Sequence, residues 1–127
     1  MYRDRLEEIR KEIPEVDAVL GTSSYDEIVL AVKQALAGNC MEKYGSLERL
    51  IVEETNRVVT TGGHYAYLKI AEGCDKRCTY CIIPKIRGKY RSVPMEQLLE
   101  SARQLVDKGV KELILVAQET TVYGKDI

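Results

Sequence analysis

Apolar residues recur at helical spacing twice in the N-terminal third of the chain. A charged stretch carries an apolar residue at every third or fourth position as far as Pro14, which predicts an amphipathic helix that ends there. Residues 17–20 then predict a short strand. A second helix is expected after Ser23 or Ser24, either of which suits an N-cap, and Gly38 should end it. The apolar faces consist of Tyr2, Leu6, Ile9 and Ile13 in the first helix and of Ile28, Val29, Val32 and Leu36 in the second.

The periodicity weakens in the middle of the chain, where glycines are frequent. We predict a connector at residues 41–63, with one short strand around residues 57–60. This connector should separate an N-terminal unit, residues 1–40, from a second unit at residues 64–127. The hydrophobic pattern sharpens again immediately after the connector.

The second unit begins with alternation of apolar and polar residues. The alternate apolar positions between Ala66 and Ile70 predict a strand that runs into a cysteine-rich loop. Pro94 suits the first turn of a helix that ends at Gly109, and residues 113–117 predict a buried strand. A strand, a helix and a strand of these lengths form a βαβ unit with parallel strands, so the predicted fold class is α/β. The buried side of this helix is expected to consist of Leu98, Leu99, Ala102, Leu105 and Val106.

Composition and charge narrow the classes of protein. The 127 residues are 45% apolar and 31% charged, which is typical of a soluble globular protein. Every apolar run falls far short of the roughly 20 residues that a bilayer span needs, and no signal peptide opens the chain. We therefore expect a cytoplasmic protein without a membrane partner. Residues 65–127 hold 11 Lys and Arg against 8 Asp and Glu, so an anionic partner is expected there.

Three of the four cysteines lie within eight residues. Cys74, Cys78 and Cys81 have CxxxCxxC spacing, which allows three thiolates to bind one metal centre. A structural zinc site normally needs four ligands, and the spare candidates, Cys40 and His64, lack the paired spacing of zinc ligands. Three thiolates leave one iron of a four-iron cluster open to a small molecule, whereas electron-transfer ferredoxins usually have a fourth cysteine. A zinc-stabilised interaction module and an iron–sulfur electron carrier are the alternatives.

The stretch from Ala66 to Pro94, AYLKIAEGCDKRCTYCIIPKIRGKYRSVP, resembles the radical S-adenosylmethionine core of the methylthiotransferase family. The resemblance implies a parallel (β/α) partial barrel and a [4Fe-4S] cluster bound by the three clustered cysteines, with S-adenosylmethionine chelating the fourth iron. It also implies that Tyr80 lies against the adenine, and Gln118 is expected to recognise the methionine amino group. The implied enzyme is a transferase that cleaves the cofactor reductively and uses a 5'-deoxyadenosyl radical. No residue of the chain is assigned as a catalytic group.

Two branches of this family differ in substrate. Asp75, the Ile82-Ile83-Pro84 run and the stretch from Gln118 to Thr121 favour the RimO-like branch, which methylthiolates an aspartate of a small-subunit ribosomal protein. The alternative is the MiaB-like branch, which modifies an adenosine of transfer RNA and more typically has asparagine at position 75. The implied partners are a ribosomal protein or the ribosome, with transfer RNA as the alternative, and a reductant such as flavodoxin or ferredoxin.

The resemblance also covers the start of the chain. Residues 1–40 resemble the tail of the family's N-terminal α/β methylthiotransferase domain, without the three cysteines that bind a second cluster there. The C-terminal RNA-binding domain that is common in the family has no counterpart in this sequence. We therefore expect a central fragment of such an enzyme, incomplete as a catalyst by itself.

Overall fold

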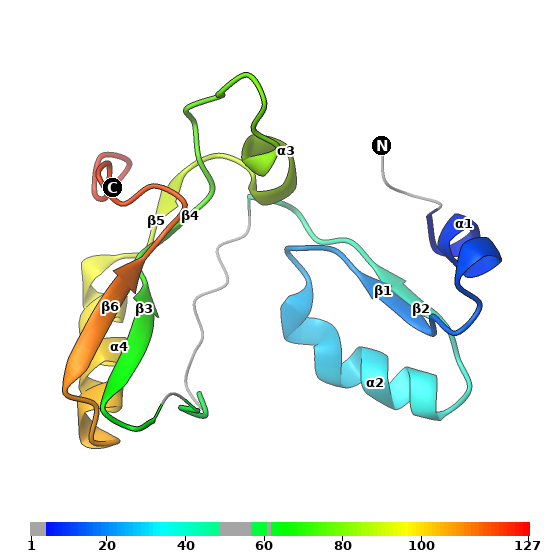
Figure 1. The fold of residues 1–127 in the computed structure, drawn as a ribbon, viewed down its shortest axis with the longest axis horizontal. Helices are drawn as coiled ribbons and strands as arrows, with labels where there is room; N and C mark the ends of the chain where they lie inside the picture. Colours follow the sequence, from blue (N-terminus) through cyan, green and yellow to red (C-terminus); the bar gives the residue numbers. More distant parts are fainter. Residues whose placement is uncertain (1–4, 49–56, 61) are drawn as a thin grey trace. The chain divides into compact units, whose positions relative to one another are not determined.

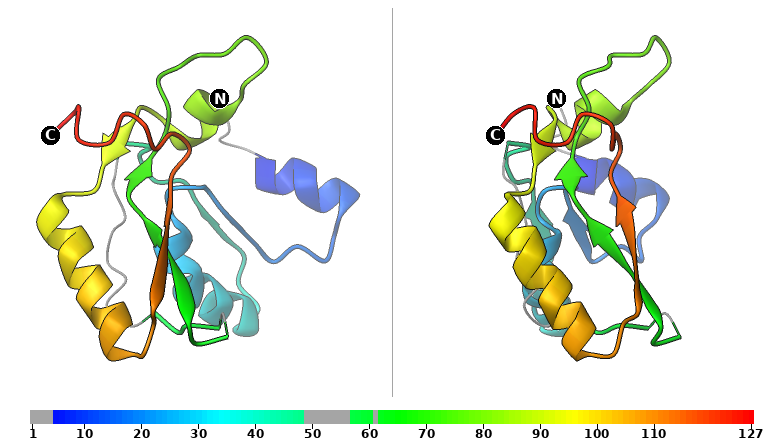
Figure 2. Two further views of the ribbon diagram at one scale, coloured as in Figure 1. Left: turned by 60° about the vertical axis from the view of Figure 1, so that its left-hand side comes forward. Right: turned by 90° about the vertical axis from the view of Figure 1, so that its left-hand side faces the viewer.

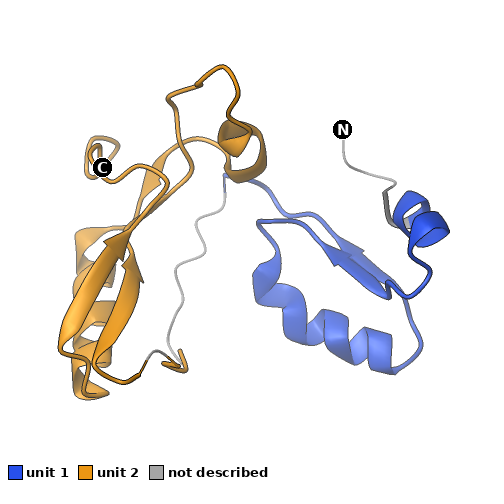
Figure 3. Ribbon diagram, viewed as in Figure 1, with its two compact units in different colours: residues 1–51 blue, residues 52–127 orange. Residues whose placement is uncertain are grey.

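The structure is a computed structural model that describes residues 5–48, 57–60 and 62–127. The chain divides into two compact units, residues 1–51 and residues 52–127 (Figures 1 and 3). This division falls inside the predicted connector, whose limits stay a prediction.

Unit 1 is a small α/β arrangement. Its two strands, β1 (Ala18–Leu20) and β2 (Met41–Lys43), pair in parallel over all three residues. The helix α2 (Ile28–Leu36) connects them and follows the single 3-10 turn η1 (Tyr25–Glu27). The helix α1 (Arg5–Glu12) comes first in the chain, as its periodicity predicts.

Three details of unit 1 differ from expectation. Ser24 precedes η1 without a side-chain capping hydrogen bond, and Glu27 is the N-cap of α2, so the predicted serine cap is wrong. Strand β2 was missed, because three residues are too few to show a periodicity. The apolar face of α2 is also open to solvent: Ala31 is 1% exposed, whereas Leu36 is 84% exposed. The C-terminal end agrees with expectation, since Gly38 follows the helix with a φ of 77°.

Unit 2 is built on a parallel βαβ motif, as predicted (Figure 2). Strand β3 (Tyr65–Lys69) pairs with β6 (Glu112–Val116) over all five residues, and α4 (Met95–Asp107) lies against one face of this pair. Pro94 is the N-cap of α4 rather than a residue of its first turn, and Gly109 ends the helix with a φ of 92°. No helix within the described ranges is long and apolar enough to cross a membrane.

The core of unit 2 lies between α4 and the sheet. Ala66, Leu105 and Val110 are 1–3% exposed and pack together, with Val59 as a partly buried neighbour. The strand predicted around Val59 is wrong, because residues 57–60 have no regular structure. These residues contribute to the core through one side chain and not through a strand pairing.

The remaining surface of the sheet and of α4 is more open than the sequence predicts. Leu115 of β6 is 56% exposed, so the predicted burial of this strand is wrong. Leu99 and Val106, expected on the buried side of α4, are 48% and 58% exposed. The reason is that β6 pairs on one side only and that one helix covers the pair, within the part of the chain that the structure describes.

A second strand pair begins directly after the C-terminal end of β3. Strand β4 (Ala71–Glu72) pairs antiparallel with β5 (Arg91–Ser92). Between them lie residues 73–82, here named the cysteine loop, and the short helix α3 (Ile83–Arg87). The pairing therefore brings together the two ends of the segment that contains the clustered cysteines. None of these three elements was predicted, since each is five residues or shorter.

Leu105→Ala should destabilise unit 2 by about 2–4 kcal/mol, because it leaves a cavity beside Ala66 and Val110. Urea titration followed by circular dichroism gives the free energy of unfolding. Leu99→Ala is the matched control on the same helix and should cost less than about 1 kcal/mol, since Leu99 is half exposed. Equal losses in the two variants would contradict the described packing of α4.

Candidate functional site

The cysteine loop leaves the sheet at its C-terminal edge, as the sequence predicts. Cys74 is buried, Cys81 is half-buried and Cys78 is exposed, and all three thiols are free. The backbone N–H of Cys81 donates to the carbonyl of Cys78 at 2.9 Å, which forms a turn at the second half of the motif. Arg77 precedes this turn with a φ of 48°, the one described non-glycine residue in the left-handed region. The loop therefore has a defined local shape at the two last cysteines.

The base of the loop depends on Gly73. This residue has a φ of 81°, and a Cβ atom at this position would lie 2.1 Å from the carbonyl oxygen of Lys89. Its N–H donates to Oε1 of Gln118 at 2.9 Å, and the next N–H, that of Cys74, donates to the carbonyl of Gly88 at 3.3 Å. Only glycine allows such a close approach of two backbone segments in this conformation. The position of Cys74 is thus fixed by backbone contacts on both sides.

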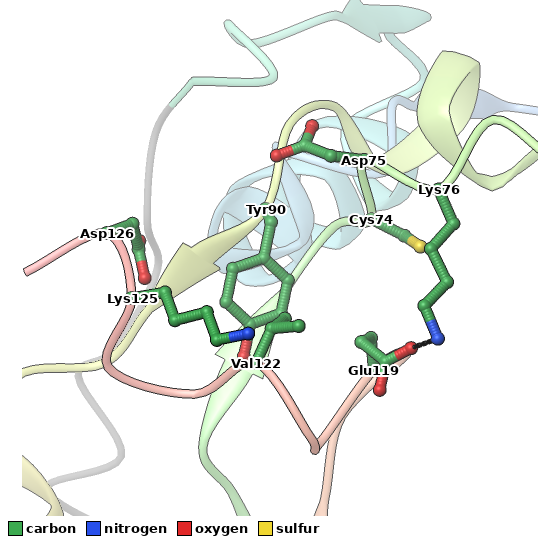
Figure 4. Close-up of a pocket in the computed structure, with 8 residues that line it drawn as sticks. All are labelled: Cys74, Asp75, Lys76, Tyr90, Glu119, Val122, Lys125 and Asp126. Carbon is green, nitrogen blue, oxygen red and sulfur yellow. Dashed lines mark ion pairs between the residues drawn. The ribbon is translucent and has the colours of Figure 1, made fainter.

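A second anchor ties the loop to the segment after β6. Lys76 forms an ion pair with Glu119 (Figure 4). The N–H and the hydroxyl of Thr121 also donate to this carboxylate. The hydrogen bonds from Lys76 and Thr121 lower the pKa of Glu119 to about 2. The carboxylate is therefore ionised throughout the neutral range.

A groove of about 360 Å³ runs beside Cys74 (Figure 4). Tyr90 forms part of its wall and is 8% exposed, and this burial raises the pKa of its phenol. Ser92, next to the groove, donates its N–H and its hydroxyl to Asp126. The groove is lined by Cys74, Asp75, Lys76, Tyr90, Glu119, Val122, Lys125 and Asp126.

Of the residues expected to bind cofactors, Gln118 contacts the cysteine loop, whereas Tyr80 is exposed and the three thiols do not lie together. Gln118 lies at the cysteine loop as expected, where its side-chain oxygen accepts the Gly73 N–H. Tyr80 is 95% exposed. Within the described residues, no three Cys, His, Asp or Glu side chains stand at metal-binding distance from one another, so the three thiols of the loop do not yet converge.

The donor set nevertheless fits a four-iron cluster. Three free thiols lie on one short loop, and no hydrogen bond or ion pair in the described structure holds any of them in another arrangement. Cysteines bind metal ions as thiolates, so these three side chains would have to lose their protons to act as ligands. Cys78 is exposed, so its thiol is accessible to a metal centre.

The two remaining candidate ligands lie elsewhere. Cys40 is an exposed thiol in unit 1 that accepts a hydrogen bond from Arg10 at 2.6 Å. His64 packs edge-on against Tyr65, with ring centroids 5.0 Å apart, and its carbonyl accepts the N–H of Lys111. Neither residue belongs to the cysteine loop.

Several residues at the site were not predicted. Glu72 and Gly73 form contacts at the base of the cysteine loop, and neither had been assigned a role. Glu119 lies in the stretch that favoured the RimO-like branch, but its ion pair with Lys76 was not predicted. A signal was available for the first two, since they stand directly before Cys74 in the sequence. Tyr90, which directly precedes β5 and is buried, had no such signal.

Comparison with known proteins agrees with this geometry. A family model described as the radical SAM superfamily matches residues 68–127. The ribosomal protein uS12 methylthiotransferase RimO of Lachnoclostridium phytofermentans is 63% identical over 121 residues, which is 95% of this chain and 28% of the relative. Proteins of the same name from Caldanaerobacter subterraneus subsp. tengcongensis and Acetivibrio thermocellus are 51% and 53% identical, over 94% and 99% of this chain. The chain thus spans about 28% of the length of the curated relatives it matches.

The chain therefore belongs to the radical S-adenosylmethionine superfamily. Within it, the chain belongs to the methylthiotransferase family, in the RimO-like branch. This membership implies a [4Fe-4S] cluster and S-adenosylmethionine as cofactors. It also confirms the expectation that the βαβ unit is the start of a radical SAM partial barrel.

Gly73→Ala should destabilise the chain well beyond the strain of a left-handed alanine, because its Cβ would collide with the backbone at Lys89. Gly124→Ala is the matched control: Gly124 has a φ of 82°, and nothing lies within 4 Å of its Cβ position. The control should lose about 1 kcal/mol, and Gly73→Ala about 1–3 kcal/mol more. Thermal unfolding compares the two; similar losses would contradict the close approach.

Glu119→Gln should lower stability at neutral pH, by an amount that depends on pH. The folded pKa of about 2 lies below the ordinary value of 4.5, so the ionised carboxylate contributes stability above pH 4.5 and loses it as the pH falls toward 2. The difference in unfolding free energy between the unchanged chain and the variant should therefore be constant above about pH 5.5 and shrink at lower pH. Urea titrations at several pH values measure it. A difference that does not change with pH would contradict the described ion pair.

Proposed function

We propose that this chain forms part of an enzyme that methylthiolates an aspartate of the small-subunit ribosomal protein uS12. The observation that carries the proposal is its similarity, over 94–99% of its length, to relatives named as uS12 methylthiotransferases. Their names do not support transfer RNA as the substrate, which was the alternative from the sequence. The whole reaction is proposed for the full-length context, because the chain spans about 28% of those relatives.

The three clustered thiols are the proposed cluster ligands. Cys74, Cys78 and Cys81 would each bind one iron as thiolates and leave the fourth iron to the amino and carboxylate groups of S-adenosylmethionine. When bound and reduced, this cofactor pair supplies an electron that cleaves the carbon–sulfur bond and yields the 5'-deoxyadenosyl radical. The protein positions the groups and shields them from water.

Other residues of the chain would bind and orient the cofactor. The Oε1 atom of Gln118 accepts the Gly73 N–H and has a second lone pair, which would accept a hydrogen bond from the methionine amino group. The ring of Tyr80, on the exposed part of the loop, would stack on the adenine. The groove beside Cys74 offers space next to the cluster ligands.

The partners follow from the substrate and from the need for an electron. The net positive charge of residues 65–127, 11 Lys and Arg against 8 Asp and Glu, favours approach to the anionic ribosome. A small reductant such as flavodoxin or ferredoxin would supply the electron. Since ribosomes and these reductants are cytoplasmic, we place the enzyme in the cytoplasm.

Electron paramagnetic resonance of the anaerobically reconstituted and reduced chain tests the proposal. We expect a four-iron signal that changes when S-adenosylmethionine is added, because the cofactor binds the open iron. Cys78→Ala should abolish this signal, since it removes one of three ligands. Iron and sulfide analysis of the same samples should give about four of each per chain in the unchanged protein.

Cys40→Ala is the matched control, because Cys40 is an exposed thiol outside the loop. It should leave both the signal and its response to the cofactor unchanged. A cluster that does not respond to S-adenosylmethionine would indicate an electron carrier instead. A colourless chain that binds zinc would indicate the third class of protein, a zinc-stabilised module.

A further inference from the structure

A buried carboxylate stands immediately before the cysteine loop. Glu72 is 8% exposed, and its Oε2 atom pairs with the ammonium group of Lys69. Its Oε1 atom lies 3.7 Å from Nη1 of Arg87 and has no hydrogen-bond partner among the described residues. A buried carboxylate without a cation would be costly, so Glu72 needs these two neighbours.

Glu72 and Arg87 lie at the two ends of the segment that contains the clustered cysteines, here named the cysteine segment. Glu72 is the last residue of β4, and Arg87 is the last residue of α3. All three clustered cysteines lie between them in the sequence. An attraction between Glu72 and Arg87 therefore closes this segment at its base and reduces the number of conformations open to the thiols.

Backbone contacts continue from the same point. The carbonyl of Gly88, next to Arg87, accepts the N–H of Cys74. The guanidinium of Arg91 donates to the carbonyls of Arg87 and Lys89, at 3.0 and 2.5 Å. A displacement of Arg87 would therefore move the acceptor that fixes the first cysteine.

The geometry also limits what else Arg87 can do. Its guanidinium lies beside Glu72, and only 36% of its side chain is exposed. An arginine guanidinium is planar and presents its donors in a rigid fork, which suits a fixed pairing with a carboxylate. Its position at the base of the loop favours a role in shaping the loop.

We propose that Glu72 and Arg87 are positioning residues that clamp the two ends of the cysteine segment and hold its thiols in reach of one cluster. The link to a cluster rests on the proposed function, whereas the clamp itself is a property of the chain without metal. Loss of either side chain opens the base of the loop and weakens its hold on the cluster. Lys69 contributes by neutralising the same carboxylate, without bridging the two ends.

Amide hydrogen exchange of the metal-free chain tests the clamp directly. Glu72→Gln and Arg87→Gln should each reduce the protection of the Cys74 and Cys81 amides about tenfold, and the double variant should not exceed the single ones. Amides of α4 and β6 should keep their protection. Unchanged loop amides, additive effects in the double variant, or equal losses in α4 would each overturn the inference.

Cluster retention then tests the consequence. In reconstituted chains challenged with a chelator, both single variants should lose iron about tenfold faster than the unchanged chain, and Arg87→Lys should recover part of the loss. Glu100→Gln is the matched control, because Glu100 pairs with Arg103 at 3.9 Å on the exposed face of α4. Retention equal to the unchanged chain would overturn the proposed effect on the cluster. A chain that assembles no cluster would contradict the proposed function, while the exchange data would still decide the clamp.

Discussion

The parallel pairing of β3 with β6 is the interaction on which unit 2 depends. Parallel strands place their C-terminal ends at the same edge of a sheet, so the segment after β3 meets the segment after β6. This meeting produces both tethers of the cysteine loop, the hydrogen bond from Gly73 to Gln118 and the ion pair of Lys76 with Glu119. The pairing also gives α4 a surface on which to bury Leu105. The position of the cysteine loop and the burial of Leu105 therefore both depend on the five residue pairs between β3 and β6.

The cysteine loop combines a rigid base with an open tip. Backbone contacts and buried charge surround Gly73 and Cys74, whereas Cys78 is exposed and Tyr80 is almost fully so. Of the three proposed cluster ligands, Cys74 is therefore held at the base of the loop, whereas Cys78 lies on its exposed part.

The sequence was most informative where a pattern is long or chemically unusual. Strand β3, helix α4 and the cysteine spacing follow from alternation, from helical periodicity and from thiol chemistry, respectively. The short strands β2, β4 and β5 could not be predicted, because each pairs with a strand that is distant in the sequence, and α3 has too few residues to show a periodicity. Burial was overestimated for Leu99 and Leu115 for a related reason. A hydrophobic pattern marks the faces that suit burial, but how many of them are covered depends on the other elements present.

The two strands of the β3–β6 pair lie far apart in the sequence and are therefore synthesised at different times. Each residue of β3 is paired with one that lies 47 positions later in the chain. At a synthesis rate of about 5–20 residues per second, β6 is completed several seconds after β3. The thiols of the cysteine loop are synthesised within that interval, before Gln118 exists to hold Gly73. The base of the loop therefore acquires its contact with Gln118 only after all three clustered thiols have been made.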